Sequence, residues 1–71
     1  MITLIEIHER LKKEIKQSKK TQTEIAKLIQ VRQQTVSEYI HGRSMPALDT
    51  FANLCKTLDV DPAYILCIRD E

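Results

Sequence analysis

Apolar residues recur every three or four positions near the start of the chain, with Glu, Arg and Lys between them. The residues with this spacing are Leu4, Ile7, Leu11 and Ile15. A period close to 3.6 residues is typical of an amphipathic α-helix that turns one face to a core. The pattern predicts a helix over residues 4–18. Thr3 and Glu6 have the spacing of a capping box at its start.

The same period returns twice after a short polar stretch. Thr21 and Glu24 repeat the capping-box spacing and predict a second, shorter helix over residues 22–29. Three residues then interrupt the period, and apolar residues resume it in a helix predicted over residues 33–41. Gly42 follows this helix at a position where a left-handed residue commonly ends a helix.

Two further helices are predicted in the last third of the chain. Pro46 cannot occupy a helix interior, so its surroundings are predicted to be a loop before a helix over residues 48–58. Asp61 as N-cap and Pro62 at the first helical position predict a last helix over residues 62–68. Because no alternating strand pattern or hairpin signal occurs, we predict an all-α fold of five compactly packed helices.

Length and composition restrict the function. A chain of 71 residues can bury a modest core, and residues 1–71 are predicted to form a single domain. No nucleophile, base or cluster of metal ligands converges in the sequence, so we expect neither an enzyme nor a cofactor. Without a long apolar run or a secretory leader, a cytoplasmic protein with no membrane partner is expected.

The cysteines and histidines do not form a metal-ligand motif. Cys55 and Cys67 lie 12 residues apart, which matches no paired zinc-ligand spacing. We expect Cys55 to be buried as an apolar residue and Cys67 to be unpaired. His8 and His41 are isolated, so no metal site is predicted.

Charge is divided unequally along the chain. Residues 1–43 hold nine Lys or Arg and five Glu, whereas residues 44–71 hold two basic and five acidic residues. The net charge of +1 therefore combines +4 in the first part with −3 in the second. This division suits a nucleic-acid binder that uses one face, but lysines on a helix are usually just a solvated surface.

Two short helices joined by three residues have the proportions of a helix-turn-helix. Residues 21–66 resemble the Cro/C1 and Xre-type helix-turn-helix repressors of phages and bacteria. The resemblance rests on Gln22, Ile25, Ala26, Ile29, Val31, Thr35, Val36, Ser37, Gly42, Pro46, Leu48, Leu58, Val60, Ile65 and Leu66. It implies a lambda-repressor-like fold and a DNA-binding transcription regulator, with repression as the expected effect.

Three positions depart from the family pattern. Gln30 and Asp59 stand at positions where glycine is common in the family. A left-handed backbone would cost a residue such as Gln30 roughly 1 kcal/mol, so the turn could instead adopt a locally different backbone. Ile40 occupies a position where relatives often carry a glutamate paired with an arginine, and the arginine position is Ile15. We expect these two isoleucines to touch and to replace the ion pair.

The resemblance also implies which side chains meet base edges. The first turns of the second helix of the motif lie in the major groove, where an amide can contact adenine N6 and N7 together. The candidate base contacts are Gln33, Gln34, Thr35, Ser37, Glu38 and Arg32. Glutamine is equally an acceptable surface helix former, and Glu38 could instead pair with a neighbouring cation.

Candidate phosphate contacts surround this helix. Gln22 stands at a helix N-terminus, where free N–H groups and the helix dipole attract an anion. The other candidates are Lys27, His41, Arg43 and Ser44, with diffuse attraction from Lys19 and Lys20. An ordinary solvated surface is the alternative for the lysines. The expected partner is double-stranded DNA, bound in its major groove.

Family members usually form homodimers through the region of the fifth helix. The predicted helix over residues 62–68 carries more apolar side chains than one face of so short a helix can bury. Tyr64, Cys67 and Ile68 are therefore candidates for the dimer interface, unless they only close the monomer core. A second functional hypothesis is the antitoxin of a toxin–antitoxin pair, whose main partner is a protein.

Overall fold

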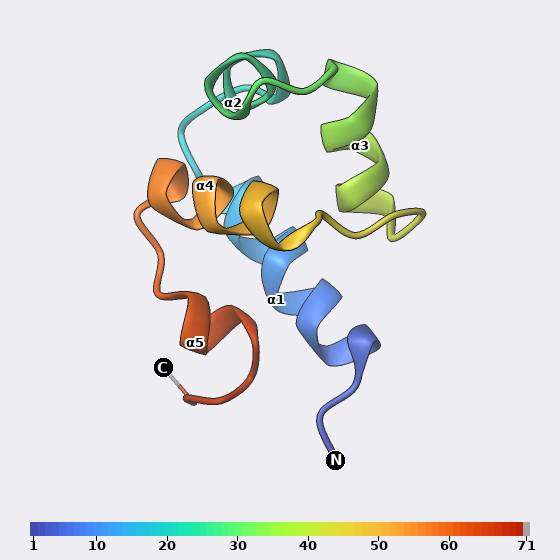
Figure 1. The fold of residues 1–71 in the computed structure, drawn as a ribbon, viewed down its shortest axis with the longest axis vertical. Coiled ribbons are helices and arrows are strands. Elements are labelled where there is room, and N and C mark those ends of the chain that lie inside the picture. Colours follow the sequence, from blue (N-terminus) through green and yellow to red (C-terminus); the bar gives the residue numbers. More distant parts are fainter. Residues whose placement is uncertain (71) are drawn as a thin grey trace.

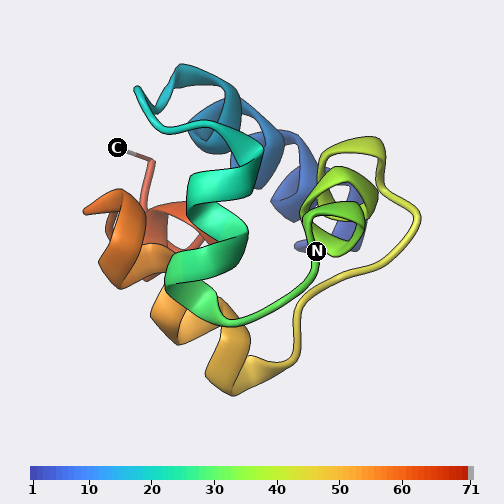
Figure 2. The ribbon, with the colours of Figure 1, turned by 90° about the horizontal axis from the view of Figure 1, so that it is seen from above.

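A computed structural model describes residues 1–70 and confirms the predicted all-α fold class. The five helices are α1 (Leu4–Gln17), α2 (Gln22–Ile29), α3 (Gln33–His41), α4 (Leu48–Leu58) and α5 (Pro62–Ile65). Helix α1 contacts α3 and α5, whereas α2 contacts α3 and α4. Figure 1 shows α2 and α3 at one end of the molecule, and Figure 2 shows α2 between α3 and α4.

One hydrophobic core joins all five helices. The buried residues are Leu11, Ile15, Ile25, Ala26, Ile29, Val36, Tyr39, Ile40, Phe51, Leu54, Cys55 and Ile65. Every helix contributes at least one of them, and burying a large aliphatic side chain contributes about 1.5–3 kcal/mol. The five helices therefore depend on one another for their stability.

Two apolar positions of the predicted helix faces lie outside the core. Leu4 and Leu48 are 67% and 88% exposed, although the period places both of them on the inner face of a helix. Each is the first residue of its helix. Periodicity alone therefore predicts one buried residue too many at the start of both α1 and α4.

The three predicted N-caps, at Thr3, Thr21 and Asp61, are confirmed by their hydrogen bonds. Thr3 and Glu6 form a capping box, and so do Thr21 and Glu24. The backbone N–H of Thr21, followed by its hydroxyl, lowers the pKa of Glu24. This cap is therefore complete at neutral pH and weakens as the pH falls through the lowered pKa. Asp61 caps α5 by accepting a hydrogen bond from the backbone N–H of Ala63 at 2.9 Å.

Four helices end in the same type of left-handed turn. The left-handed residues are Gln30, Gly42, Asp59 and Cys67, with φ of 60°, 73°, 55° and 64°. In each turn the next residue donates its N–H to a carbonyl five positions earlier, as in a Schellman motif. These bonds are Val31 to Ala26, Arg43 to Glu38, Val60 to Cys55 and Ile68 to Ala63, at 2.9 to 3.0 Å. The turn at Gln30 therefore keeps its left-handed backbone without the adjustment considered above.

The predicted extent of the last helix is wrong, because α5 ends at Ile65 instead of residue 68. The left-handed backbone of Cys67 turns the chain back, and the N–H of Cys67 donates to the carbonyl of Tyr64 at 3.0 Å. The end of α1 differs by one residue, since Ser18 has an extended backbone and accordingly follows the helix.

Arg10 of α1 holds the returning segment in place. Its Nη1 donates to the carbonyls of Tyr64 and Arg69 at 2.8 and 2.7 Å. Its guanidinium also lies over the Tyr64 ring, 4.6 Å from the ring centroid, in a cation–π contact. Arg69 in turn pairs with Asp61 at 2.9 Å. The C-terminal segment is thus fastened to α1 mainly through its backbone.

Both cysteines are free thiols, as expected. Cys55 is buried in the core, and Cys67 is half-buried. Burial raises the pKa of Cys55, and the charge of Asp61 adds to this effect. Cys55 therefore remains a neutral thiol at physiological pH and behaves as a small apolar residue.

Replacing Gln30 by glycine should stabilise the protein. Gln30→Gly removes the strain of a left-handed side chain, and we expect the free energy of unfolding to rise by about 0.5–1 kcal/mol in urea melts. Gln17→Gly is the matched control, because Gln17 is helical and glycine there should lower stability by up to ~1 kcal/mol. Equal losses in both variants would contradict the assignment of strain to Gln30.

Candidate nucleic-acid interface

The helix-turn-helix consists of α2, the turn at residues 30–32 and α3. Arg32 is the N-cap of α3, but its side chain makes no capping hydrogen bond and remains exposed. The Arg32 carbonyl instead accepts the N–H groups of Thr35 and Val36 at 3.0 and 3.4 Å. The side chain of Arg32 is therefore available for a ligand next to the first turn of α3.

The predicted base contacts lie together on the outer side of α3. Val36, Tyr39 and Ile40 are buried, which leaves the opposite side of the helix to solvent. On that side, Arg32, Gln33 and Gln34 are exposed, while Thr35, Ser37 and Glu38 are half-buried. Glu38 forms no ion pair within residues 1–70. The first turn of α3 thus presents two neighbouring amides without an internal partner among the described residues.

The predicted phosphate contacts are more widely distributed. Gln22 is the first residue of α2 and is half-buried, whereas Lys27 is exposed on the same helix. Exposed Arg43 and half-buried Ser44 follow the left-handed turn at Gly42. The structure brings Gln22 close to the C-terminal end of α3, where both Gln22 and His41 line one hollow. Lys27, Arg43 and Ser44 do not line it.

His41 has a defined orientation. Its Nδ1 lies 2.8 Å from the carbonyl oxygen of Ser37. Because a carbonyl can only accept, Nδ1 carries a proton and donates it in this bond. The Ser37 hydroxyl lies 3.4 Å from the same nitrogen. In the neutral ring, Nε2 therefore keeps a lone pair, and it becomes a donor only when the ring is protonated.

His8 contacts the end of α3, although it was not among the predicted site residues. Its Nε2 lies 3.1 Å from the carbonyl oxygen of Ile40, and its ring packs against Gly42. A Cβ at Gly42 would approach this ring to 3.0 Å. Gly42 is therefore favoured by its left-handed backbone and by the close approach of His8. The sequence offers no signal for this contact, because it depends on how α1 crosses α3.

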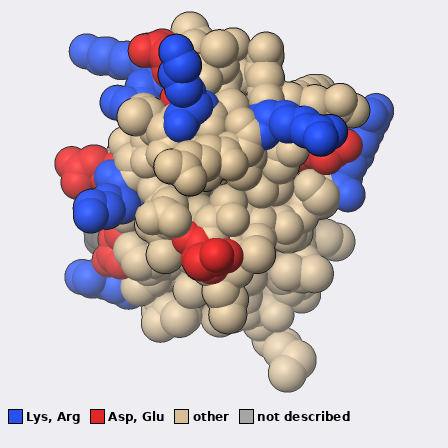
Figure 3. Space-filling model, turned by 45° about the horizontal axis from the view of Figure 1, so that its top comes forward, with Lys and Arg blue, Asp and Glu red and all other residues tan. Residues whose placement is uncertain are grey.

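Basic side chains gather on the same side of the molecule as the helix-turn-helix. Figure 3 shows Lys and Arg along the upper part of this face, where Figure 1 has α2 and α3. Acidic side chains lie beside some of these basic ones, and one acidic side chain lies near the middle of the same face (Figure 3). The basic first part of the sequence therefore contributes a basic region to the surface near α2 and α3. Polyanions are attracted to such a region.

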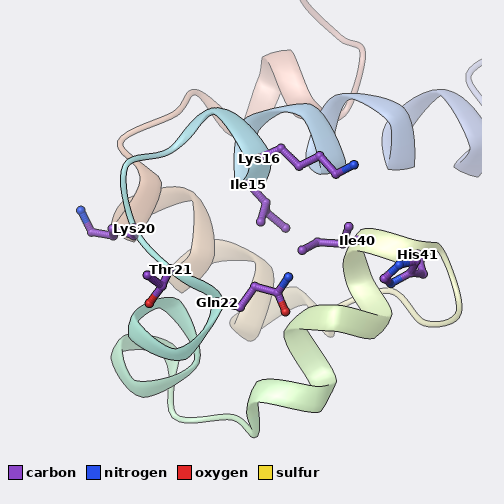
Figure 4. Close-up of a pocket in the computed structure, with 7 residues that line it drawn as sticks. All are labelled: Ile15, Lys16, Lys20, Thr21, Gln22, Ile40 and His41. Carbon is purple, nitrogen blue, oxygen red and sulfur yellow. The ribbon is translucent and has the colours of Figure 1, made fainter.

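The hollow between α1, α2 and α3 has a volume of about 370 Å³. Its lining residues are Ile15, Lys16, Lys20, Thr21, Gln22, Ile40 and His41. Ile15 and Ile40, which are predicted to touch, point toward one another, and both belong to the core (Figure 4). Lys16 was not among the predicted site residues. The sequence offers one signal for Lys16: it directly follows Ile15, which was predicted to touch Ile40 of the third helix.

Neither a candidate metal centre nor a candidate membrane span is found within residues 1–70. No group of three His, Cys, Asp or Glu side chains within them could hold a metal ion. Among these residues, no helix combines the length and the apolar character that crossing a membrane requires.

Comparison with known protein families agrees with this geometry. A family model described as helix-turn-helix matches residues 11–65, which is 55 of the 71 residues. The chain belongs to the Cro/C1-type helix-turn-helix family. Members of this family are DNA-binding regulatory domains and are not typically enzymes. No curated protein and no solved structure gave a significant match.

Family membership assigns double-stranded DNA as the ligand of the domain. The candidate dimer residues lie outside the helix-turn-helix, in and after α5. Ile68 is 68% exposed, whereas Tyr64 and Cys67 are half-buried. Tyr64 already contacts Arg10 within the same chain. Of the three, Ile68 has the most apolar surface available to a partner.

A carboxylate at position 40 should destabilise this helix-turn-helix protein. Ile40 is 7% exposed beside Ile15, so Ile40→Glu should lower the free energy of unfolding by ~3 kcal/mol if its charge lacks a partner. The double variant with Ile15→Arg should recover part of the loss through an ion pair. Denaturant melts measure both effects. A double variant that is no more stable than Ile40→Glu would show that the two side chains do not interact.

Proposed function

We propose that this protein is a cytoplasmic, sequence-specific transcriptional regulator in which residues 1–71 act as one DNA-binding domain. It binds as a homodimer to an operator with two half-sites and represses transcription by covering a promoter. The observation that carries the proposal is the first turn of α3. There the side chains of Gln33 and Gln34 are exposed to solvent, while Val36 of the same helix is buried.

Direct reading of bases suits the side chains of this turn. A glutamine amide donates and accepts at once and can bind adenine N6 and N7 together, while the Thr35 methyl suits a thymine methyl. Ala, Glu or Lys would favour an α-helix more than Thr does and at least as much as Gln. The exposed Gln-Gln-Thr triplet is therefore better explained by recognition than by helix stability.

Positioning on the DNA backbone involves other residues. In the sequence, Gln22 at the start of α2 precedes α3 and Arg43 follows it. Both side chains would contact phosphates. Such contacts carry no sequence information, but they fix the orientation of α3 in the groove. Their contribution should decrease with increasing salt concentration.

A dimer supplies the specificity that one copy lacks. A helix as short as α3 reads only a few base pairs, whereas two copies read two half-sites. Exposed Ile68, beside half-buried Tyr64 and Cys67, supports pairing through the C-terminal segment. Selection of bound duplexes from random DNA should then enrich a motif with half-site centres about 10 base pairs apart. Recovery of unrelated duplexes would contradict sequence-specific binding.

The two classes of DNA contact should respond differently to mutation. Gln33→Ala should weaken binding to the best operator by ~1–3 kcal/mol and binding to random DNA much less. Arg43→Ala should weaken both alike and reduce the slope of log affinity against log salt by ~1. Affinities measured over a range of salt concentrations separate these outcomes. If both substitutions lower specific and random binding by the same factor, Gln33 does not read a base.

A charge in the proposed interface should prevent pairing. Ile68→Lys should give a folded, helical monomer with weak binding to the two-half-site operator. Leu48→Lys is the matched control, because Leu48 is also exposed but lies outside the proposed interface. Sedimentation equilibrium measures the association of both variants and of the unmodified protein. A monomeric unmodified protein with full operator affinity would overturn the dimer.

A further inference from the structure

One side chain of α1 crosses to the C-terminal segment and binds it at two points. The Nη1 of Arg10 donates to the carbonyl of Tyr64 at 2.8 Å and to the carbonyl of Arg69 at 2.7 Å. Tyr64 belongs to α5, whereas Arg69 follows the left-handed turn at Cys67. Arg10 therefore joins the two ends of residues 64–69, which we call the C-terminal loop.

Arg10 is the main polar link between the C-terminal loop and α1. Inside the loop region, the N–H groups of Ile68 and Arg69 donate to the carbonyl of Ala63 at 2.9 and 3.1 Å. Within residues 1–70, only Arg10 makes hydrogen bonds between α1 and the loop. Its guanidinium also lies over the Tyr64 ring, 4.6 Å from the ring centroid. Hydrogen bonds from a charged donor are roughly twice as strong as neutral ones.

Ile68 lies in this loop and has the most apolar surface available among the proposed dimer residues. Its side chain is 68% exposed. Its backbone lies between the two carbonyls that Arg10 binds, so its position relative to α1 depends on these two bonds. A second copy that packs on Ile68 would therefore be oriented through Arg10.

The same turn of α1 also contacts the end of α3. His8 precedes Arg10 by two residues, and its Nε2 lies 3.1 Å from the carbonyl oxygen of Ile40. Two residues of an α-helix differ by about 200° in direction and by ~3 Å along the axis. Figure 1 shows α1 between α3 and α5, both of which it contacts. One turn of α1 therefore holds α3 on one side and the C-terminal loop on nearly the opposite side.

We propose that Arg10 is a positioning residue that fixes the separation of the two reading helices in the dimer. It thereby selects the spacing of half-sites that the dimer accepts. The inference rests on the proposed function, because it requires a homodimer that pairs through the C-terminal loop. Family membership does not assign this role, since the matched residues 11–65 include neither Arg10 nor Ile68.

Operators of different spacing test the role of Arg10. The affinity of the full chain is measured on duplexes that carry the selected half-site twice, with centres ~8 to ~12 base pairs apart, around the expected helical turn. The unmodified protein should prefer one spacing about tenfold, because a wrong spacing costs the second copy its base contacts. Arg10→Ala should bind the preferred operator about tenfold more weakly and should largely lose the preference among spacings.

Binding to a single half-site separates positioning from a general loss of structure. Arg10→Ala should bind a duplex with one half-site as tightly as the unmodified protein does, because Arg10 lies outside the proposed reading surface. A merely structural role would weaken binding to one half-site and to two half-sites by the same factor. Such parallel losses, with the spacing preference unchanged, would overturn the proposal.

Three further variants control for charge and side-chain length. Arg10→Lys should restore part of the spacing preference, because an ammonium can donate to carbonyls and lie over an aromatic ring. Arg10→Met keeps most of the length without the charge and should behave like Arg10→Ala. Lys13→Ala is the matched control, since Lys13 is an exposed cation of the same helix outside these contacts. Equal effects of Lys13→Ala and Arg10→Ala would overturn the proposal.

Hydrogen exchange of the DNA-free protein measures the loop itself. In Arg10→Ala, the amides of Ile68 and Arg69 should exchange about tenfold faster, because the loop opens more often without its link to α1. The amide of Leu54, in the core, should exchange at an unchanged rate. Unchanged exchange at Ile68 and Arg69 would show that the loop does not depend on Arg10 and would overturn the proposal.

The results also distinguish this inference from the proposed function. If sedimentation finds only monomers, or if selection enriches no motif, the proposed function fails and the role of Arg10 in spacing fails with it. If the protein is a dimer that selects two half-sites, but Arg10→Ala keeps the same spacing preference, the role of Arg10 alone is overturned.

Discussion

The left-handed backbone of Gln30 sets the direction of α3, and the surface that we propose to meet DNA depends on this direction. The bond from the Val31 N–H to the Ala26 carbonyl, at 2.9 Å, closes the turn and fixes where the next helix begins. Val36 then enters the core, and the helical period turns Gln33 outward. A turn of different handedness would direct α3 elsewhere and take Val36 out of the core. The strain at one exposed glutamine is accordingly offset by the core that the turn makes possible.

Helix α1 is the support on which this motif rests. It contacts α3 through Ile15, and His8 reaches the Ile40 carbonyl near the end of that helix. Arg10 fastens the C-terminal segment to the same helix through two backbone carbonyls. One helix therefore connects the proposed reading surface with the proposed dimer surface. The relative position of two half-site readers would depend on this connection more than on α2 or α4.

The sequence predicts local features of the protein better than features that depend on approach between helices. The bounds of α2, α3 and α4 follow from caps, apolar period and helix-ending residues, all of which act within a few positions. The end of α5 does not follow from such local signals. Cysteine is not a residue that predicts a left-handed turn, yet Cys67 adopts a left-handed backbone. The exposed face of α3 follows from its period. The hollow beside Lys16 does not, since it exists only where three helices meet.

On the proposed function, α3 is held at both of its ends. Gln33 meets bases at the N-terminal end, and Arg43 meets a phosphate just beyond the last residue His41, which lies eight positions after Gln33 on the same helix. At 1.5 Å per residue the two ends of the helix are about 12 Å apart. Two contacts on a rigid helix determine its tilt in the groove, which a single contact leaves free. Phosphate contacts beyond the end of α3 would thus contribute to base recognition indirectly, by holding the amide of Gln33 at the angle that a two-point contact with adenine requires.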